Sequence, residues 1–364
     1  MKMVGIGCLL LFTSVSYAAE LEPIQVSRDG RGFARATSGK SFTPWGFNYD
    51  HDRNGRLLED YWNDEWSTVE EDFAEMKSLG ANVVRIHLQV GAFMSAPDKP
   101  RPAALAQLKR LVKLAQQQEL YLDLTGLGCY HKQDIPKWYH ALDEQERWKT
   151  QAAFWSAIAE TCAGSPAIFC YDLMNEPVVP GGAKPQENWL GPGLGDKFFV
   201  QYISRDRADR DRAEIAKAWI SQLVQAIRQH DQQHLITVGL VPWSLDRPGL
   251  SSGFAPEKIA DELDFIAVHL YPKSGKQAEA LETLAGFAAA GKPVIIEEMF
   301  PLGCSAAELG EFIDQSQPQA CGWIGFYWGM TPAEYRKGDQ TIGQALTLAW
   351  LELFQSQRLA GIGD

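Results

Sequence analysis

Two acidic residues directly follow apolar runs that have the composition of buried strands. Glu176 comes after Ile168–Met174, and Glu298 comes after Val294–Ile296 as the second of two adjacent glutamates. A buried charge without a partner is expensive, so each carboxylate must meet either a counter-ion or a cleft. Two carboxylates that face each other across a cleft can supply the proton donor and the nucleophile of glycoside hydrolysis. Two structural ion pairs are the alternative interpretation of the same residues.

The residues next to these acids favour a particular orientation for each. Pro177 disfavours helical backbone at Glu176, so we expect an extended conformation that projects this side chain from the strand end. Successive side chains of a strand point to opposite faces. We therefore expect only one of Glu297 and Glu298 to face the site.

Positioning these acids requires a sheet, and the chain alternates short apolar runs with amphipathic segments, as a parallel sheet covered by helices does. We predict eight strands, at Thr43–Asn48, Asn82–Leu88, Leu120–Thr125, Ala167–Met174, Leu235–Leu240, Phe265–Tyr271, Pro293–Glu298 and Gly322–Trp328. Helices are predicted between them at Thr68–Leu79, Ala103–Gln118, Glu144–Cys162 and Arg212–His230. Eight strand–helix units in 364 residues favour an α/β fold, a single closed (β/α)8 TIM barrel, over an open doubly wound sheet. No GxGxxG motif follows any of these strands, which argues against dinucleotide binding.

Two segments do not follow the strand–helix alternation. The stretch from Val178 to Arg212 is rich in Gly, Pro and aromatic residues and follows the fourth predicted strand. Loops of this length inside a compact domain are usually functional or disordered, and we interpret it as a long insertion that walls the cleft. Leu21–Ser41 is expected to be a short extended segment, such as a hairpin, that closes one end of the fold.

The acidic motifs match those of a known family. Active sites of barrels lie at the C-terminal ends of the strands, where this chain carries its charged, imidazole and aromatic residues. With these motifs the sequence resembles glycoside hydrolase family 5, which includes endoglucanases and β-mannanases and belongs to a clan of retaining (β/α)8 glycosidases. The Asn-Glu-Pro sequence matches the family's acid/base motif, which implies that Glu176 is the general acid and then the base, and that Asn175 binds the sugar 2-hydroxyl. Pro293–Glu298 resembles the strand that bears the nucleophile, and its register implies Glu298 in that role.

The resemblance implies supporting roles for four further residues. Arg85 matches an arginine that orients the nucleophile, and Tyr271 matches a tyrosine that donates a hydrogen bond to it. His269 matches a histidine that supports the acid/base residue. Trp328 matches the tryptophan that forms the floor of the subsite for the reacting sugar.

The chain departs from the family pattern at the end of the third predicted strand. The family usually has a histidine there, where this sequence has Thr125, and His131 is the candidate replacement from the following loop. Met299-Phe300 also replaces the aromatic residue and glycine that often follow the nucleophile, which indicates an atypical subfamily.

Trp243 lies near a strand end, where it either contacts sugar or packs at the rim. The same two interpretations apply to Trp45, Tyr49, Asp50 and His51.

The net charge of the chain argues against some classes of partner. The sequence has 34 basic and 46 acidic residues, which gives a formal net charge of −12. Such a protein repels nucleic acid and anionic lipid headgroups, so we expect a neutral carbohydrate substrate, no nucleic-acid partner and no membrane anchor. We also expect a monomer. The double-displacement mechanism requires no metal and no organic cofactor, and we expect neither.

The N-terminus has the features of a signal peptide. Lys2 supplies a positive charge, Met3–Val15 is mostly apolar, and small residues at 16–19 offer a cleavage site. We therefore predict a signal peptide at 1–19, one (β/α)8 catalytic domain at 20–364, and a secreted or periplasmic location.

The cysteines after the predicted signal peptide are odd in number, so at least one must be free. Cys304 and Cys321 are a candidate pair. The sequence leaves the pairing open among Cys129, Cys162, Cys170, Cys304 and Cys321.

We thus expect a secreted retaining β-glycosidase that hydrolyses a β-linked glucan, mannan or related oligosaccharide by double displacement. Its two carboxylates should lie roughly 5–5.5 Å apart. A catalytically impaired carbohydrate-binding barrel is an alternative, because the third strand lacks its histidine. A barrel metallohydrolase is disfavoured, because no predicted strand ends in His-x-His. The sequence leaves open which sugar is cut and whether the action is endo or exo.

Overall fold

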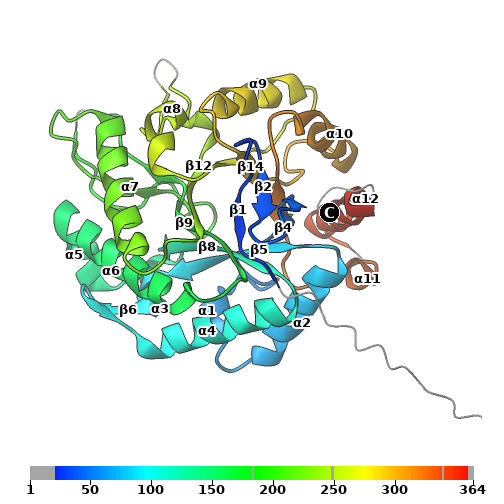
Figure 1. Ribbon diagram of the computed structural model, residues 1–364, viewed down its shortest axis with the longest axis horizontal. Helices are drawn as coiled ribbons and strands as arrows, with labels where there is room; N and C mark the ends of the chain where they lie inside the picture. Colours follow the sequence, from blue (N-terminus) through cyan, green and yellow to red (C-terminus); the bar gives the residue numbers. More distant parts are fainter. Residues whose placement is uncertain (1–20, 183, 247–249, 338–339, 360–364) are drawn as a thin grey trace, which may run out of the picture.

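The computed structural model describes residues 21–359 apart from 183, 247–249 and 338–339 (Figure 1). The predicted signal peptide at 1–19 lies outside these residues. No helix in the described part of the chain is long and apolar enough to cross a membrane.

Eight parallel strands close into a barrel, which confirms the predicted α/β fold and all eight predicted strands. The strands are β4 (Trp45–Tyr49), β5 (Val83–Gln89), β8 (Tyr121–Gly128), β9 (Ile168–Asn175), β12 (Leu235–Leu240), β13 (Ile266–His269), β14 (Val294–Glu298) and β15 (Trp323–Phe326). Each strand is buried over its whole length. Strands that are covered on both faces read as nearly continuous apolar runs, and this is why the sequence reveals them.

Helices form a ring outside the barrel (Figure 1). The longer ones are α2 (Trp66–Ser78), α4 (Pro102–Gln117), α6 (Glu144–Cys162), α7 (Arg212–Arg228), α9 (Gln277–Ala288), α10 (Ala306–Ser316) and α12 (Ile342–Leu359). The four predicted helices are confirmed to within about two residues at each end. The helix α6 begins after Asp143, whose side chain accepts a hydrogen bond from the backbone N–H of Glu146 and so caps a free donor.

Shorter elements connect the strands and helices. The short helices are α1 (Leu58–Tyr61), α3 (Val90–Phe93), α5 (Lys137–Ala141), α8 (Pro256–Ile259) and α11 (Pro332–Tyr335). Single 3-10 turns are η1 (Lys132–Asp134), η2 (Pro242–Ser244) and η3 (Ala260–Glu262). The strands β6 (Met94–Ala96) and β7 (Lys99–Pro100) form a small antiparallel pair.

A small antiparallel sheet closes the N-terminal end of the barrel, as the sequence predicts for this segment. It consists of β1 (Ile24–Val26), β2 (Phe33–Arg35) and β3 (Ser41–Phe42). Phe33 packs edge-on against Phe169 and Phe265, which lie at the starts of two barrel strands. This plug leaves the C-terminal end of the barrel for a site.

The predicted insertion after β9 crosses the C-terminal end of the barrel. It contains β11 (Gln201–Tyr202), which pairs with β10 (Pro177–Val178). Its Lys197 forms a β-bridge with His131. The ammonium group of Lys197 packs against Gly55, in the loop after β4. The insertion therefore reaches from β9 to the loop after β4 and walls the mouth of the barrel.

Candidate active site

Glu176 lies immediately after β9 in a left-handed backbone conformation, with φ of +47°. This region is uncommon for residues other than glycine, and the predicted extended conformation is wrong. Hydrogen bonds on both sides impose the conformation: the Glu176 N–H donates to the carbonyl of Gly239 at 3.0 Å, and the Glu176 carbonyl accepts from Gln201 at 3.4 Å. Strained backbone of this kind is held only where its surroundings determine it. It projects the carboxylate over the end of the barrel.

Glu298 ends β14 and is held by three side chains. Its Oε1 accepts a hydrogen bond from Arg85 Nη1 at 2.7 Å, and its Oε2 accepts one from the Tyr271 hydroxyl at 2.6 Å. His269 Nδ1 lies 3.4 Å from the same Oε2. Charge-assisted hydrogen bonds of this length fix the orientation of a carboxylate.

The two acids lie close together around one imidazole. His269 Nδ1 is 2.9 Å from Glu176 Oε1, and one oxygen of Glu176 lies within 4.8 Å of one oxygen of Glu298. Carboxylates that leave room for a water molecule stand about 6.5–9.5 Å apart, whereas those of retaining enzymes stand about 5–5.5 Å apart. The spacing here fits attack by a carboxylate on the sugar.

Arg85 of β5 is fully buried and connects the acids to the strands around it. Besides Glu298, it donates to Asn48 Oδ1 at 2.8 Å, to Asp172 Oδ2 at 2.8 Å and to Asn175 Oδ1 at 2.9 Å. The planar guanidinium suits several acceptors at once. Asn175 also donates to the carbonyl of Phe199 at 3.2 Å, so both ends of its amide have protein partners.

Glu297 reaches the same interior from the residue next to Glu298. Its Oε2 lies 3.3 Å from His269 Nε2 and 3.4 Å from Arg85 Nη2. The pairing of β13 with β14 skips Glu297, because Val268 is opposite Ile296 and His269 is opposite Glu298. As the sequence predicts, only Glu298 lines the pocket. The alternation behind that prediction nevertheless fails, since this bulge turns both side chains inward.

A pocket of about 300 Å³ opens above the two acids. Its lining residues are Asp50, His51, His87, Glu176, Leu194, Phe199, Tyr271, Glu298, Phe300, Leu302, Phe326 and Trp328. The Trp328 indole N–H donates to Asp50 Oδ1 at 3.0 Å, and the His51 ring stacks parallel to the indole at 5.5 Å. The pocket thus combines an aromatic wall with carboxylates, a pattern that suits a sugar.

The structure does not bring His131 or Trp243 into this pocket. His131 lines a separate cavity of about 260 Å³ with Glu59 and Asp134, because its backbone pairs with the insertion and turns the ring away. Trp243 lies on η2, is 36% exposed and does not contribute to the pocket lining.

Two histidines line the pocket, His51 and His87. The second lies at the end of β5, and the sequence did not reveal its role. Its Nδ1 lies 2.5 Å from the Tyr130 hydroxyl, and its Nε2 lies 3.3 Å from Asn48 Oδ1. Burial and the charge of Arg85 hold the pKa of His87 well below its usual range. A neutral imidazole therefore faces the pocket. The only sequence signal for it is the position of His87 two residues after Arg85.

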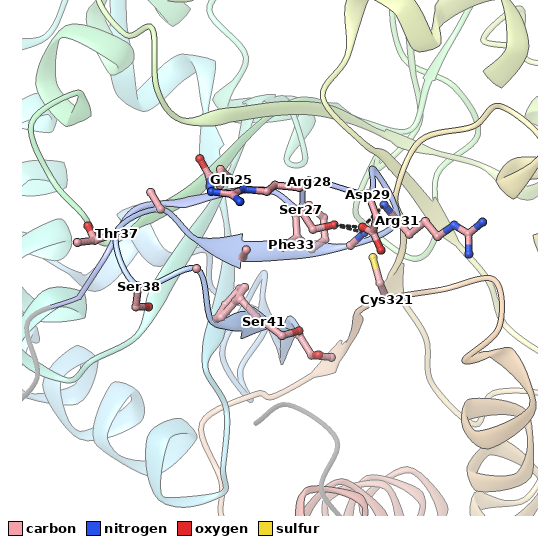
Figure 2. A pocket seen from close by; sticks show the side chains of 16 residues that line it. Gln25, Ser27, Arg28, Asp29, Arg31, Phe33, Thr37, Ser38, Ser41 and Cys321 are labelled. Carbon is pink, nitrogen blue, oxygen red and sulfur yellow. Dashed lines mark hydrogen bonds between the residues drawn. The ribbon is translucent and has the colours of Figure 1, made fainter.

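A larger cavity, of about 760 Å³, lies at the opposite end of the barrel (Figure 2). The plug formed by β1, β2 and β3 lines it together with Cys321. Its one acidic lining residue is Asp29, whose carboxylate accepts hydrogen bonds from the Ser27 hydroxyl and the Arg31 N–H. This cavity lacks a second acid, so the size of a cavity does not identify the site here.

All five cysteines in the described part of the chain are free thiols, including the candidate pair Cys304 and Cys321.

The family model for cellulase, glycosyl hydrolase family 5, matches residues 38–330. The chain belongs to glycoside hydrolase family 5. It is therefore a glycoside hydrolase, as the sequence motifs indicate.

Relatives and solved structures include several β-mannan enzymes. Mannan endo-1,4-beta-mannosidase A of Podospora anserina is 25% identical over 222 residues, which cover 54% of this chain and 51% of that protein. The chain thus spans about half the length of this relative.

Solved structures share the fold over most of this chain. The exo-beta-1,4-mannosidase Op5Man5 of Opitutaceae bacterium strain TAV5 matches with a TM-score of 0.67 and 18% identity, over 93% of this chain and 62% of that one. The endo-1,4-beta-mannanase of Rhizomucor miehei matches with a TM-score of 0.63 and 19% identity, over 93% of this chain and 100% of that one. A GH5_18 protein of Streptomyces cattleya in complex with GlcNAc matches with a TM-score of 0.62 and 17% identity, over 88% and 81%.

Proposed function

We propose that this chain is a secreted retaining β-glycosidase that cleaves β-mannosidic bonds in short oligosaccharides, with Glu298 as nucleophile and Glu176 as acid/base. The observation that carries the proposal is the approach of the two carboxylates to within 4.8 Å of each other, with His269 between them. The names of the similar proteins, which are mannanases and a mannosidase, favour a mannoside over a glucan.

In the first step, Glu298 attacks the anomeric carbon while Glu176 gives its proton to the departing oxygen. The bond from the anomeric carbon to the leaving oxygen breaks, and an ester to Glu298 forms. Arg85 and Tyr271 fix the direction of the Glu298 carboxylate before the attack.

In the second step, Glu176 removes a proton from water, and the water oxygen attacks the anomeric carbon. The ester bond breaks and Glu298 leaves as a carboxylate, again stabilised by Arg85. Two inversions give a product with the configuration of the substrate.

The sugar in the pocket would lie against Trp328, with polar groups at its edge. Burial raises the pKa of Asp50, although the charge of nearby His51 and the Trp328 N–H oppose the shift. A carboxylate with one accepted hydrogen bond has acceptor sites left for sugar hydroxyls. Asp50 is therefore proposed as a residue that binds hydroxyl groups, with His87 as a neutral partner.

The insertion supports short substrates. Leu194 and Phe199 of the insertion line the pocket. Lys197 extends the wall to the loop at Gly55. A cleft that is blocked on this side would accept the end of a chain rather than its middle, and detection of mid-chain cleavage in long mannan would contradict this.

The test is a screen of manno-, gluco- and mixed oligosaccharides, with proton NMR of the first product formed. We expect release of mannose or a short mannoside in the β configuration, and no turnover by Glu298→Ala. Initial formation of the α anomer, or full turnover by Glu298→Ala, would contradict the assignment. Tight binding of oligosaccharide without turnover by the wild type would support the carbohydrate-binding alternative. Secretion is tested separately, by N-terminal sequencing of protein recovered outside the cytoplasm.

A further inference from the structure

Three buried carboxylates lie in the barrel interior beneath the pocket. Asp123 of β8, Asp172 of β9 and Glu297 of β14 have no exposed surface, and one oxygen of each lies within 4.8 Å of the others. Three charges at this spacing in a dry interior repel strongly, so each needs a donor or a counter-ion. The proposed steps at the pocket use none of the three directly.

Asp172 is fully supplied with donors. Its Oδ2 accepts from Arg85 Nη2 at 2.8 Å and from the Thr125 hydroxyl at 2.7 Å, and its Oδ1 accepts from the N–H of Gly239 at 2.7 Å. Burial raises the pKa of Asp172 to about 6, so it is ionised at neutral pH.

Glu297 has two cationic neighbours on one oxygen and none on the other. Its Oε2 faces His269 and Arg85, whereas its Oε1 is buried without a partner. Although burial opposes ionisation, the charges of Arg85 and His269 lower the pKa of Glu297. Glu297 is therefore an anion with one unused acceptor.

Asp123 has no comparable support. Neither of its carboxyl oxygens receives a hydrogen bond from an N–H or O–H group of the described residues, and the donor beside it is the weak thiol of Cys170. An ionised Asp123 would be a buried charge without compensation. Burial, followed by the charge of Glu297, raises the pKa of Asp123 well above its usual range.

We propose that Asp123 carries a proton at neutral pH and donates it in a hydrogen bond to Glu297, and that Glu297 in turn holds His269 as an imidazolium beneath Glu176. One proton shared in this way gives a hydrogen-bond partner to both Asp123 and Glu297, whose buried oxygens otherwise lack one. Asp123 and Glu297 are positioning residues, because they act on the reaction through His269. The inference rests on the acid/base role proposed for Glu176.

The surroundings of His269 fit this arrangement. Although burial opposes the charged ring, Glu298, Glu176 and Glu297 raise the pKa of His269 to about 10. The charged or titratable groups around the ring are Arg85 and His87 of β5, Glu176 after β9, Tyr271 after β13, and Glu297 and Glu298 of β14. Those around Asp123 are Arg85, Cys170, Asp172 and Glu297.

A fixed cation at His269 has a clear use. When Glu176 gives up its proton, it becomes a carboxylate 2.9 Å from His269 Nδ1, and a preorganised positive charge stabilises it without rearrangement. Asp123 is connected to this contact only through Glu297 and His269. Because it is protonated, it adds no negative charge to the site.

The first experiment is an NMR titration of the His269 ring in the wild type, Glu297→Gln and Asp123→Asn. A His269→Gln spectrum identifies the signal among the seven histidines. In Glu297→Gln we expect the titration midpoint to fall by about one unit or more, because an opposite charge is lost. In Asp123→Asn we expect the midpoint to stay within about 0.3 units, because a neutral donor replaces a neutral donor. A fall in Asp123→Asn as large as that in Glu297→Gln would show that Asp123 is charged and overturn the proposal.

The second experiment needs no substitution, so it holds even where a variant fails to fold. Infrared spectra of wild type with carboxyl-labelled aspartate at pH 7 should contain the C=O stretch of a buried protonated acid. Absence of that band, or one equivalent of a bound metal ion in the wild type by elemental analysis, would overturn the proposal. Neither experiment uses a substrate, so failure of the proposed glycosidase activity would leave both results interpretable.

Discussion

Truncation of Glu176 and of Glu298, each followed by azide rescue, separates the acid/base from the nucleophile. The two side chains are 16% and 12% exposed at the pocket. Replacement of either by alanine therefore opens a small space beside the sugar that a small anion can enter. The two roles differ in which face of the anomeric carbon the anion then attacks.

The size of the loss in Glu176→Ala follows from its two proton transfers. General acid–base catalysis contributes about 10²–10⁴-fold, which is roughly 3–5 kcal/mol of transition-state stabilisation at 1.36 kcal/mol per decade. For an oligosaccharide the departing oxygen needs the proton, so kcat/KM should fall by this amount. For a dinitrophenyl mannoside the departing oxygen needs no proton, so the first step should be almost unaffected and kcat should fall through the second step.

The assay is hydrolysis of both substrates with and without azide, with NMR identification of the glycosyl azide. In Glu176→Ala the ester to Glu298 still forms, so azide should restore turnover and give the β-azide. In Glu298→Ala no ester forms, so azide should attack directly and give the α-azide. Glu160→Ala, on the exposed side of α6, is a matched control that should behave as wild type.

The result that would refute this reasoning is an α-azide from Glu176→Ala or a β-azide from Glu298→Ala, since either exchanges the roles. An equal loss of kcat/KM on the oligosaccharide and on the dinitrophenyl mannoside in Glu176→Ala would also contradict proton donation to the departing oxygen.

Three further predictions follow from single contacts. Asp50→Asn should reduce kcat/KM on oligosaccharides by roughly 10–100-fold, the effect of a lost hydrogen bond to a charged group; an unchanged value would remove Asp50 from the sugar site. Burial raises the pKa of Glu59 from 4.5 to about 7. Between these pH values the folded protein keeps the proton while the unfolded chain loses it. The free energy of unfolding therefore falls as pH rises through this window. Glu59→Gln keeps the acceptor for the Gln89 N–H and should gain up to about 3 kcal/mol over wild type in urea unfolding at pH 8, with no difference at pH 4; equal gains at both pH values would contradict the charge argument. Asp143→Ala should lower the free energy of unfolding by about 1 kcal/mol through loss of the α6 cap, with kcat unchanged.

The sequence predicts the barrel well because burial on both faces produces long apolar runs, and the plug and the insertion stand out as interruptions of the repeat. The acids are predictable for the complementary reason, since a carboxylate directly after a buried strand must lie at the open end of a barrel. The role of His87 in the pocket is harder to predict. His87 and His131 both follow strands, and only the pairing of His131 with the insertion shows that its ring faces another cavity.

Sequence patterns do not reveal the β-bulges in the barrel strands. Pairing registers shift near the ends of β8, β9 and β14, at the end of the barrel that carries the site. A bulge places two residues of one strand opposite one of its neighbour, so strict alternation no longer separates inward from outward side chains. At β14 this lets Glu298 face the sugar while Glu297 faces the ring that holds Glu176. The same local shift thus supplies the proposed nucleophile and the proposed counter-ion of His269 from consecutive residues, and a straight strand would place only one of them inward.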